Sequence, residues 1–188
     1  MTRIIGGAAR GRSLRVPERG TRPTSDRVRE SVFSSLEHRL GAWHGLVVFD
    51  LYAGSGALAL EALSRGASRA VAVESDRRAV QVLRANAAMT GLAPEIVQAD
   101  VARFVRQRPA TPPDVVFADP PYDVPAETLR ANLAALLAQI QGHEVLLVIE
   151  RSARDTASAV PEGCTEVEVR TVGETAITYA HWYGVPHE

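Results

Sequence analysis

Hydrophobic residues form short runs that alternate with amphipathic stretches over most of the chain. Five runs lie between residues 46 and 150: LVVFDLY (46–52), AVAVE (70–74), EIVQA (95–99), DVVFA (114–118) and EVLLVIE (144–150). The stretches between them, at 57–66, 76–91, 101–108 and 125–141, place apolar residues at helical spacing. Nearly continuous apolar strands that alternate with helices predict a parallel sheet covered on both faces.

The last part of the chain has a different pattern. CTEVEVRTV (164–172) and TAITYAHWYG (175–184) are two strand-like runs joined by Gly173 and Glu174. Such a short connection predicts an antiparallel hairpin. We therefore expect an α/β fold with a doubly wound, mostly parallel sheet of seven strands that ends in this hairpin.

The first residues predict an extension of this body. RIIGGAARGRSLRVP (3–17) is typical of a β-hairpin around a Gly/Ala-rich turn, and residues 18–24 form a linker. A helix follows over residues 24–40, with Thr24, Ser25 or Asp26 as its candidate N-cap. We expect a hairpin-and-helix extension over residues 1–42 and one main domain over residues 43–188.

The amino-acid composition indicates the class of protein and its cellular compartment. The 188 residues are 46% hydrophobic and 23% charged, which is typical of a globular protein. No apolar run is long enough to cross a membrane, the N-terminus lacks the apolar core of a secretory signal, and Cys164 is the single cysteine. These features predict a cytoplasmic protein without a membrane partner.

Charge is unevenly distributed, although the net charge is only −1. Residues 1–30, the basic arm, hold eight arginines and three acids, while the rest of the chain holds thirteen arginines and nineteen acids. A basic arm on an acidic body suits a polyanionic partner, and a merely solvated terminal segment is the alternative.

A glycine-rich turn follows the first apolar run of the body. In FDLYAGSGALALEAL (49–63), Ala53, Gly54, Ser55 and Gly56 lie between a strand and a helix, where ligands bind in open α/β sheets. The turn fits the dinucleotide pattern G-x-G-x-x-A, so it is a weak signal when taken alone.

Acids near the ends of three predicted strands help to distinguish between possible cofactors. Asp50 precedes the turn and would repel a pyrophosphate but attract an ammonium group. Glu74 is placed to accept from ribose hydroxyls, and Asp100 from an adenine amine. Together they favour S-adenosylmethionine. The alternatives are a loop-stabilising acid for Asp50, a solvated strand end for Glu74 and a helix N-cap for Asp100.

The fourth apolar run ends in Asp119-Pro120-Pro121-Tyr122. An exocyclic amine is a poor nucleophile because its lone pair is delocalised. The Asp119 carboxylate and the Pro120 carbonyl can each accept one of its N–H groups and free that lone pair for attack on a methyl group. Tyr122 offers a ring for stacking a target base. The five histidines show no ligand spacing, so no metal is expected.

These motifs resemble known enzymes. The D-P-P-Y motif after such a glycine turn resembles the amino-methylating class I S-adenosylmethionine methyltransferases. R-x-I-G-G-x-x-R-G-R, then R-P-T-S-D-R-V-R-E-S-V-F-S-S-L, then D-L-Y-A-G-S-G-A-L, resemble the RsmD-type bacterial small-subunit ribosomal RNA (guanine-N2) methyltransferases, and the likeness extends to the final G-E-T-A-I. Ala59 and Tyr52 depart from the family's glycine and phenylalanine, and we expect both to lie behind the loop.

The resemblance implies a Rossmann-like methyltransferase that converts S-adenosylmethionine to S-adenosylhomocysteine and acts on the N2 amine of a guanine. It implies a small ribosomal subunit or its assembly intermediate as partner. Nothing in the sequence requires more than a monomer. The catalytic residues would be Asp119, Pro120 and Tyr122. The cofactor would be bound by Asp50, Ala53, Gly54, Ser55, Gly56, Glu74, Asp100 and Thr24. The RNA would be contacted by Arg3, Arg10, Arg12, Arg15, Arg19, Arg22 and Tyr122.

Three other functions remain open from the residues. The same amine chemistry could act on DNA adenine at N6 or on protein glutamine. The glycine turn could serve a nicotinamide-dependent oxidoreductase. A non-catalytic RNA-binding module would use the basic arm but leave the D-P-P-Y motif without a purpose.

Overall fold

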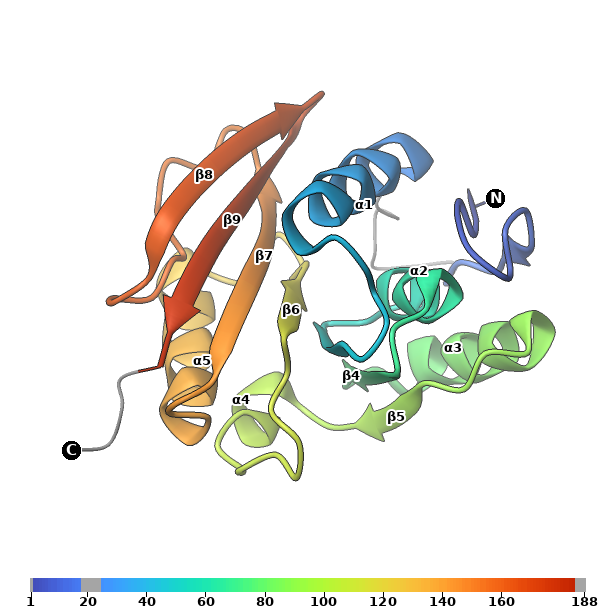
Figure 1. Cartoon of the computed structure of the whole chain (residues 1–188), viewed down its shortest axis with the longest axis horizontal. Coiled ribbons are helices and arrows are strands. Elements are labelled where there is room, and N and C mark those ends of the chain that lie inside the picture. The colour runs from blue at the N-terminus through green and yellow to red at the C-terminus, as the bar shows by residue number, and fades with distance from the viewer. Residues whose placement is uncertain (1, 18–24, 185–188) are drawn as a thin grey trace.

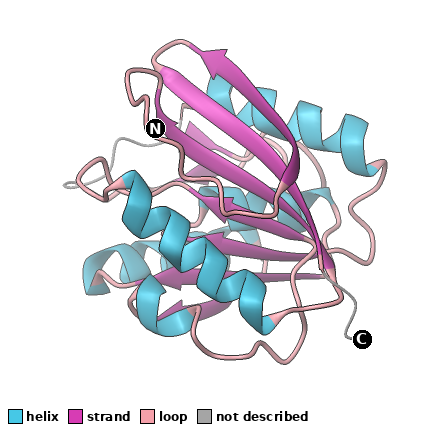
Figure 2. Ribbon diagram, turned by 90° about the vertical axis from the view of Figure 1, so that its left-hand side faces the viewer, coloured by secondary structure: helices cyan, strands magenta, loops and turns pink. Residues whose placement is uncertain are grey.

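A seven-stranded sheet runs through the centre of the molecule between two layers of helices (Figure 1; Figure 2). The computed structural model describes residues 2–17 and 25–184. Across the sheet the strands are β5 (Glu95–Gln98), β4 (Arg69–Glu74), β3 (Val47–Leu51), β6 (Val115–Ala118), β7 (Glu144–Ser152), β9 (Thr175–Tyr183) and β8 (Thr165–Val172). The first five are parallel, and β9 and β8 continue the sheet antiparallel. Both features confirm the predicted topology.

Each face of the sheet has its own hydrophobic core. On one face, α1 (Asp26–Leu40), α2 (Ala57–Arg65) and α3 (Arg77–Thr90) pack around Val48, Phe117 and Val148. On the other face, α4 (Val101–Phe104) and α5 (Ala126–Gln139) pack around Phe49 and Leu147. Strands covered on both sides explain why the apolar runs of the sequence are nearly continuous.

The N-terminal extension forms the predicted hairpin and helix. β1 (Thr2–Arg3) pairs antiparallel with β2 (Ser13–Leu14), and Ser25 caps α1 by accepting from the Val28 amide at 3.2 Å. Val32, Phe33 and other buried residues of α1 belong to the core of the main sheet. The division into residues 1–42 and 43–188 stays a prediction, and the linker at 18–24 lies outside the described residues.

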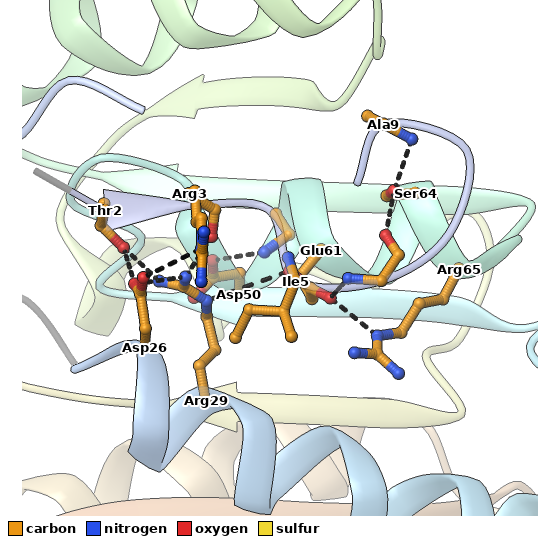
Figure 3. A network of polar contacts seen from close by, with 12 residues as sticks. Thr2, Arg3, Ile5, Ala9, Asp26, Arg29, Asp50, Glu61, Ser64 and Arg65 are labelled. Carbon is orange, nitrogen blue, oxygen red and sulfur yellow. Dashed lines mark hydrogen bonds and ion pairs between the residues drawn. The ribbon is translucent and has the colours of Figure 1, made fainter. Parts of the chain in front are cut away.

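A buried carboxylate ties the hairpin to α2 (Figure 3). Glu61 is fully buried and accepts from the backbone amides of Ile5 and Gly6, both at 2.7 Å, and from Arg65 Nε at 2.8 Å. Arg29 of α1 is also fully buried, with its Nε 4.0 Å from a Glu61 oxygen. Because buried charges need partners, Glu61 is satisfied only while the hairpin is in place.

Arg29 continues this network toward the start of the chain. Its Nη1 donates to Thr2 Oγ1 at 2.9 Å, and its Nη2 donates to Asp26 Oδ1 at 3.0 Å and to the carbonyl of Arg3. One guanidinium therefore joins β1 to α1. The position of the hairpin is set by these polar contacts and by a small apolar cluster around Ile4, Leu14 and Leu60.

One predicted element is shorter in the structure. The helix expected over residues 101–108 is the single turn α4, which ends at Phe104. Pro109, Pro112 and Pro113 follow closely, and a proline cannot donate the backbone hydrogen bond that a continuing helix needs. The chain instead turns back at Gln107, whose amide donates to the Phe104 carbonyl at 3.1 Å.

Replacing Glu61 by alanine should lower the free energy of unfolding by about 3–5 kcal/mol, because the buried Arg29 would lose one of its two acidic partners and the amides of Ile5 and Gly6 would lose their acceptor. Urea unfolding followed by tryptophan fluorescence measures this. Glu37→Ala is the matched control: Glu37 also pairs with Arg65, at 2.5 Å, but is 47% exposed. Its loss should cost less than about 1 kcal/mol. Equal losses in the two variants would contradict the anchoring role of Glu61.

Candidate active site

The carboxyl ends of β3, β6 and β7 open into one cavity of about 530 Å³. This volume lies in the range of small-molecule sites. The parallel register pairs Leu51 with Ala118 and Ala118 with Ile149, so β3 and β6 end at the same height, while β7 continues to Ser152. The wall also includes the N-terminal extension and the turn between β8 and β9, through Thr2, Val16, Ser25, Arg27, Arg29, Val172, Gly173 and Thr175.

The glycine turn lines the cavity beside β3. Ala53, Gly54 and Ser55 face it, while Gly56 does not. Gly56 has a φ of 79°, and a Cβ there would lie 2.8 Å from Leu83 Cγ, so only glycine fits under the loop. Gly54 has a φ of 54° and no atom within 4 Å of its missing Cβ. Its backbone is therefore open to a ligand.

Asp50 is a deeply buried acid of the cavity. It is 1% exposed, and its Oδ2 accepts from the Ala59 amide at 3.0 Å, whereas Oδ1 has no hydrogen-bond partner among the described residues. Burial raises the pKa of Asp50 from 3.8 to about 8; the Ala59 amide opposes this shift, and the nearby carboxylates of Asp119 and Glu74 add to it. Burial destabilises the ionised form of Asp50, and a cationic group beside Oδ1 would stabilise it.

Glu74 and Asp100 hold backbone amides and lie outside the cavity wall. Glu74 accepts from the amides of Gly54 and Asp76, both at 2.8 Å, and so fixes the glycine turn. Asp100 caps α4 by accepting from the Arg103 amide at 3.3 Å, so the alternative of a helix N-cap is confirmed. Their roles toward ribose and adenine stay predictions.

The D-P-P-Y motif lies where the sequence predicted, directly after β6 and beside β3. Asp119 is half-buried and Pro120 is buried, and both line the cavity together with Pro121. Tyr122 is 66% exposed at the same wall, so its ring can be reached from solvent. The cavity thus combines acceptors at its base with an exposed ring at its mouth.

Tyr52 belongs to the cavity wall and has a backbone φ of 67°. Its side chain packs against the core on the α4 and α5 side of the sheet. The hydroxyl accepts from Asn132 Nδ2 of α5 at 3.2 Å, and burial raises the pKa of Tyr52. A phenylalanine could not make this bond. Ala59, in contrast, is fully buried behind the loop, as expected.

Four of the predicted RNA-contacting arginines lie in the described part of the extension. Arg3, Arg10, Arg12 and Arg15 are exposed. Arg12 donates to the Met89 carbonyl at 2.8 Å, and the backbone of Arg15 is held by both polar atoms of the buried Asn86 side chain. Asn86 also donates to the Ser55 carbonyl at 2.9 Å. The exit of the hairpin is therefore joined to the glycine turn. Arg19, Arg22 and Thr24 lie outside the described residues.

Sequence reasoning missed the far side of the cavity. Glu150, Arg151 and Ser152 line it at the end of β7. A signal was present, because the fifth apolar run also ends in an acid, as the runs before Glu74 and Asp119 do. Arg27 and Arg29 gave no such signal, since their place in the wall depends on contacts between α1 and the hairpin.

The residues fit S-adenosylmethionine. Its ammonium group would match the unpartnered Oδ1 of Asp50, and the open backbone at Gly54 would admit its chain. Within residues 2–17 and 25–184 no group of three metal-ligating side chains occurs. The helices of the same two ranges include none long and apolar enough to cross a membrane.

Comparison with known proteins decides the family. A family model described as conserved hypothetical protein 95 matches residues 2–181. Ribosomal RNA small subunit methyltransferase D of Escherichia coli is 45% identical over 122 residues, which are 64% of this chain and 60% of that protein. The Haemophilus influenzae protein of the same name is 32% identical over 177 residues, which are 91% of this chain and 89% of that protein. The chain belongs to the RsmD family.

Solved structures agree with this assignment. The Escherichia coli protein yhhF is 32% identical to this RsmD-family chain, with a TM-score of 0.80, and the match covers 98% of this chain and 99% of that one. The fold is that of the class I methyltransferases. Both the predicted fold class and the predicted family resemblance are confirmed.

The titration of Asp50 should be visible in the stability of this RsmD-family protein. A pKa raised from 3.8 to about 8 means that the folded state holds more protons than the unfolded state between these pH values. The free energy of unfolding should therefore fall as pH rises through this window, by up to about 1.4 kcal/mol per pH unit.

Asp50→Asn removes that titration, so its stability relative to the wild type should rise with pH. Urea unfolding of both proteins at about pH 5 and about pH 8 measures the difference. A difference between the two proteins that does not change with pH would show that Asp50 titrates near its ordinary pKa.

Proposed function

We propose that this chain transfers a methyl group from S-adenosylmethionine to the exocyclic N2 amine of a guanine in small-subunit ribosomal RNA. The observation that carries the proposal is the single cavity shared by the glycine turn after β3 and the D-P-P-Y motif after β6. A site for a cationic methyl donor and acceptors for an amine lie on neighbouring strands.

The chemistry follows from these positions. S-adenosylmethionine supplies, when bound, a methyl group made electrophilic by its positive sulfur. Asp119 and the Pro120 carbonyl hold the two N–H groups of the amine and direct its lone pair toward that methyl group. As the N–C bond forms, the C–S electron pair stays on sulfur, and Asp119 takes the surplus proton of the amine and passes it to water.

The substrate class rests on the relatives and on charge. The similar proteins of Escherichia coli and Haemophilus influenzae are named ribosomal RNA small subunit methyltransferase D. The exposed arginines Arg10, Arg12 and Arg15 support an RNA partner, because phosphate contacts position a polyanion before its base is read. The choice of guanine N2 derives from the family resemblance. A cytoplasmic monomer acting on the small subunit or its assembly intermediate completes the proposal.

A labelled methyl group tests the reaction. The protein is given S-adenosylmethionine with a labelled methyl, together with unmethylated small subunits, the RNA stripped from them, or duplex DNA. Label recovered as N2-methylguanosine supports the proposal. Label found only in DNA as N6-methyladenine, or only in protein amides, would agree with the methylation of an amine but would show that ribosomal RNA is not the substrate. Thermal stabilisation by NAD but not by S-adenosylhomocysteine would contradict the proposal that S-adenosylmethionine is the cofactor.

Asp119→Ala should lower turnover by about 100-fold or more, because the amine loses an oriented proton acceptor. Binding of S-adenosylhomocysteine, measured by calorimetry, should stay within about threefold of the wild type, since Asp119 is assigned to the amine and not to the cofactor. The control is Asp123→Ala, an exposed acid four residues on that lies outside the cavity wall. Normal turnover in Asp119→Ala would show that Asp119 has no role in the reaction.

Replacing Arg10, Arg12 and Arg15 together by alanine should weaken RNA binding and make the salt dependence shallower. Each lost phosphate contact reduces the slope of log K against log salt by about 0.7, so the triple variant should lose about 2. The control removes the same charge at the exposed residues Arg106, Arg108 and Arg130 of the main domain. An equal change of slope in both triple variants would show that the basic arm has no special contact with RNA.

A further inference from the structure

We propose that Glu150 reads the Watson–Crick edge of the target guanine and so sets the choice of base. The inference rests on the proposed function, because it concerns the amine acceptor of that reaction. It arises from the far side of the cavity, where the end of β7 brings a second carboxylate next to Asp119.

The register of the sheet places the two acids together. Ala118 of β6 and Ile149 of β7 form the last pair of their ladder, and Asp119 and Glu150 are the residues that come directly after this pair. Neighbouring strands are about 4.8 Å apart, and paired residues point to the same face of a sheet. Phe117 and Val148, two residues earlier on each strand, pack in the core beneath α1. Both acids therefore face that side, and both line the cavity.

The strand order also divides the cavity between two ligands. The glycine turn follows β3, on one side of β6, whereas Glu150 lies near the end of β7, on the other side. A donor bound over β3 leaves the space over β6 and β7 for the methyl acceptor. Ser152 and Thr175, paired across β7 and β9, complete the wall of this second space.

The hydrogen-bonding groups of the bases indicate which base Glu150 would recognise. Guanine presents its N1–H donor next to the N2 amine, and a carboxylate can accept from N1 while Asp119 and Pro120 hold N2. Adenine presents a lone pair at N1, which a carboxylate repels. A carboxylate beside the amine-binding acid therefore accepts guanine and rejects bases with an acceptor at that position.

Other charged groups on this side of the cavity take part in ion pairs and hydrogen bonds. Arg151 donates through Nε to Asp155 at 2.8 Å and through Nη1 to the Val124 carbonyl at 2.7 Å. Glu174, in the β8–β9 turn, is 60% exposed and pairs with Arg154 at 3.1 Å. Glu150 is the acid of the β7 side that is half-buried and in register with Asp119.

The test compares guanine with 2-aminopurine, which keeps the 2-amine but has an acceptor in place of N1–H. The target nucleotide is first mapped with the wild-type enzyme, and splinted ligation then places either base there in the same RNA. The wild type should prefer guanine. Glu150→Gln should reduce or reverse the preference by about tenfold or more, because the glutamine amide can donate to N1 of 2-aminopurine. Comparing the preference between enzymes cancels the different reactivity of the two amines.

Two controls isolate the base reading. Glu144→Gln makes the same change at the opposite end of β7, where the side chain is 61% exposed, and should leave the preference unchanged. S-adenosylhomocysteine should bind Glu150→Gln as it binds the wild type. If Glu150→Gln slows both bases equally, the acid only supports the fold and the inference is wrong. If the wild type methylates neither base in any RNA, the proposed function itself fails.

Discussion

Parallel hydrogen bonding between β3, β6 and β7 is the constraint on which the site depends. The register Leu51–Ala118–Ile149 aligns the three strands, so the residues that follow these positions, Tyr52, Asp119 and Glu150, all line one cavity. The parallel arrangement requires helical crossovers, and these cover both faces of the sheet. The strand ends are thus left as the open edge where polar side chains can gather at the rim of an apolar core.

The N-terminal extension depends on a second, polar constraint. Glu61 in α2 is satisfied by backbone amides of the hairpin, and Arg29 joins the same network from α1. Buried charges of this kind add specificity of position more than stability, because their desolvation offsets most of their attraction. The extension becomes a wall of the cavity rather than a loose tail, and Asn86 connects its exit to the glycine turn.

The strands of the main sheet and part of the candidate site could be predicted from the sequence. Apolar runs and a two-residue turn predicted the seven strands, and acids after such runs pointed to Asp50 and Asp119. Glu61 could not be found in this way, since it lies inside an apolar helix and its partners are amides 55 and 56 residues away. Glu74 and Asp100 were recognised as strand-end acids, but which amides they hold depends on loop geometry that spacing does not encode. Gly56 lies outside the cavity wall, where a Cβ would meet Leu83, and its contact with the cofactor stays a prediction.

A crystal structure of the protein with S-adenosylhomocysteine tests the division of the cavity most directly. The account predicts that the amino acid portion lies over the glycine turn, with its ammonium near Asp50, and that the sulfur faces Asp119. The space over β6 and β7 would then stay open for the methyl acceptor. S-adenosylhomocysteine bound over β7 and the β8–β9 turn, with its sulfur directed away from Asp119, would contradict the account.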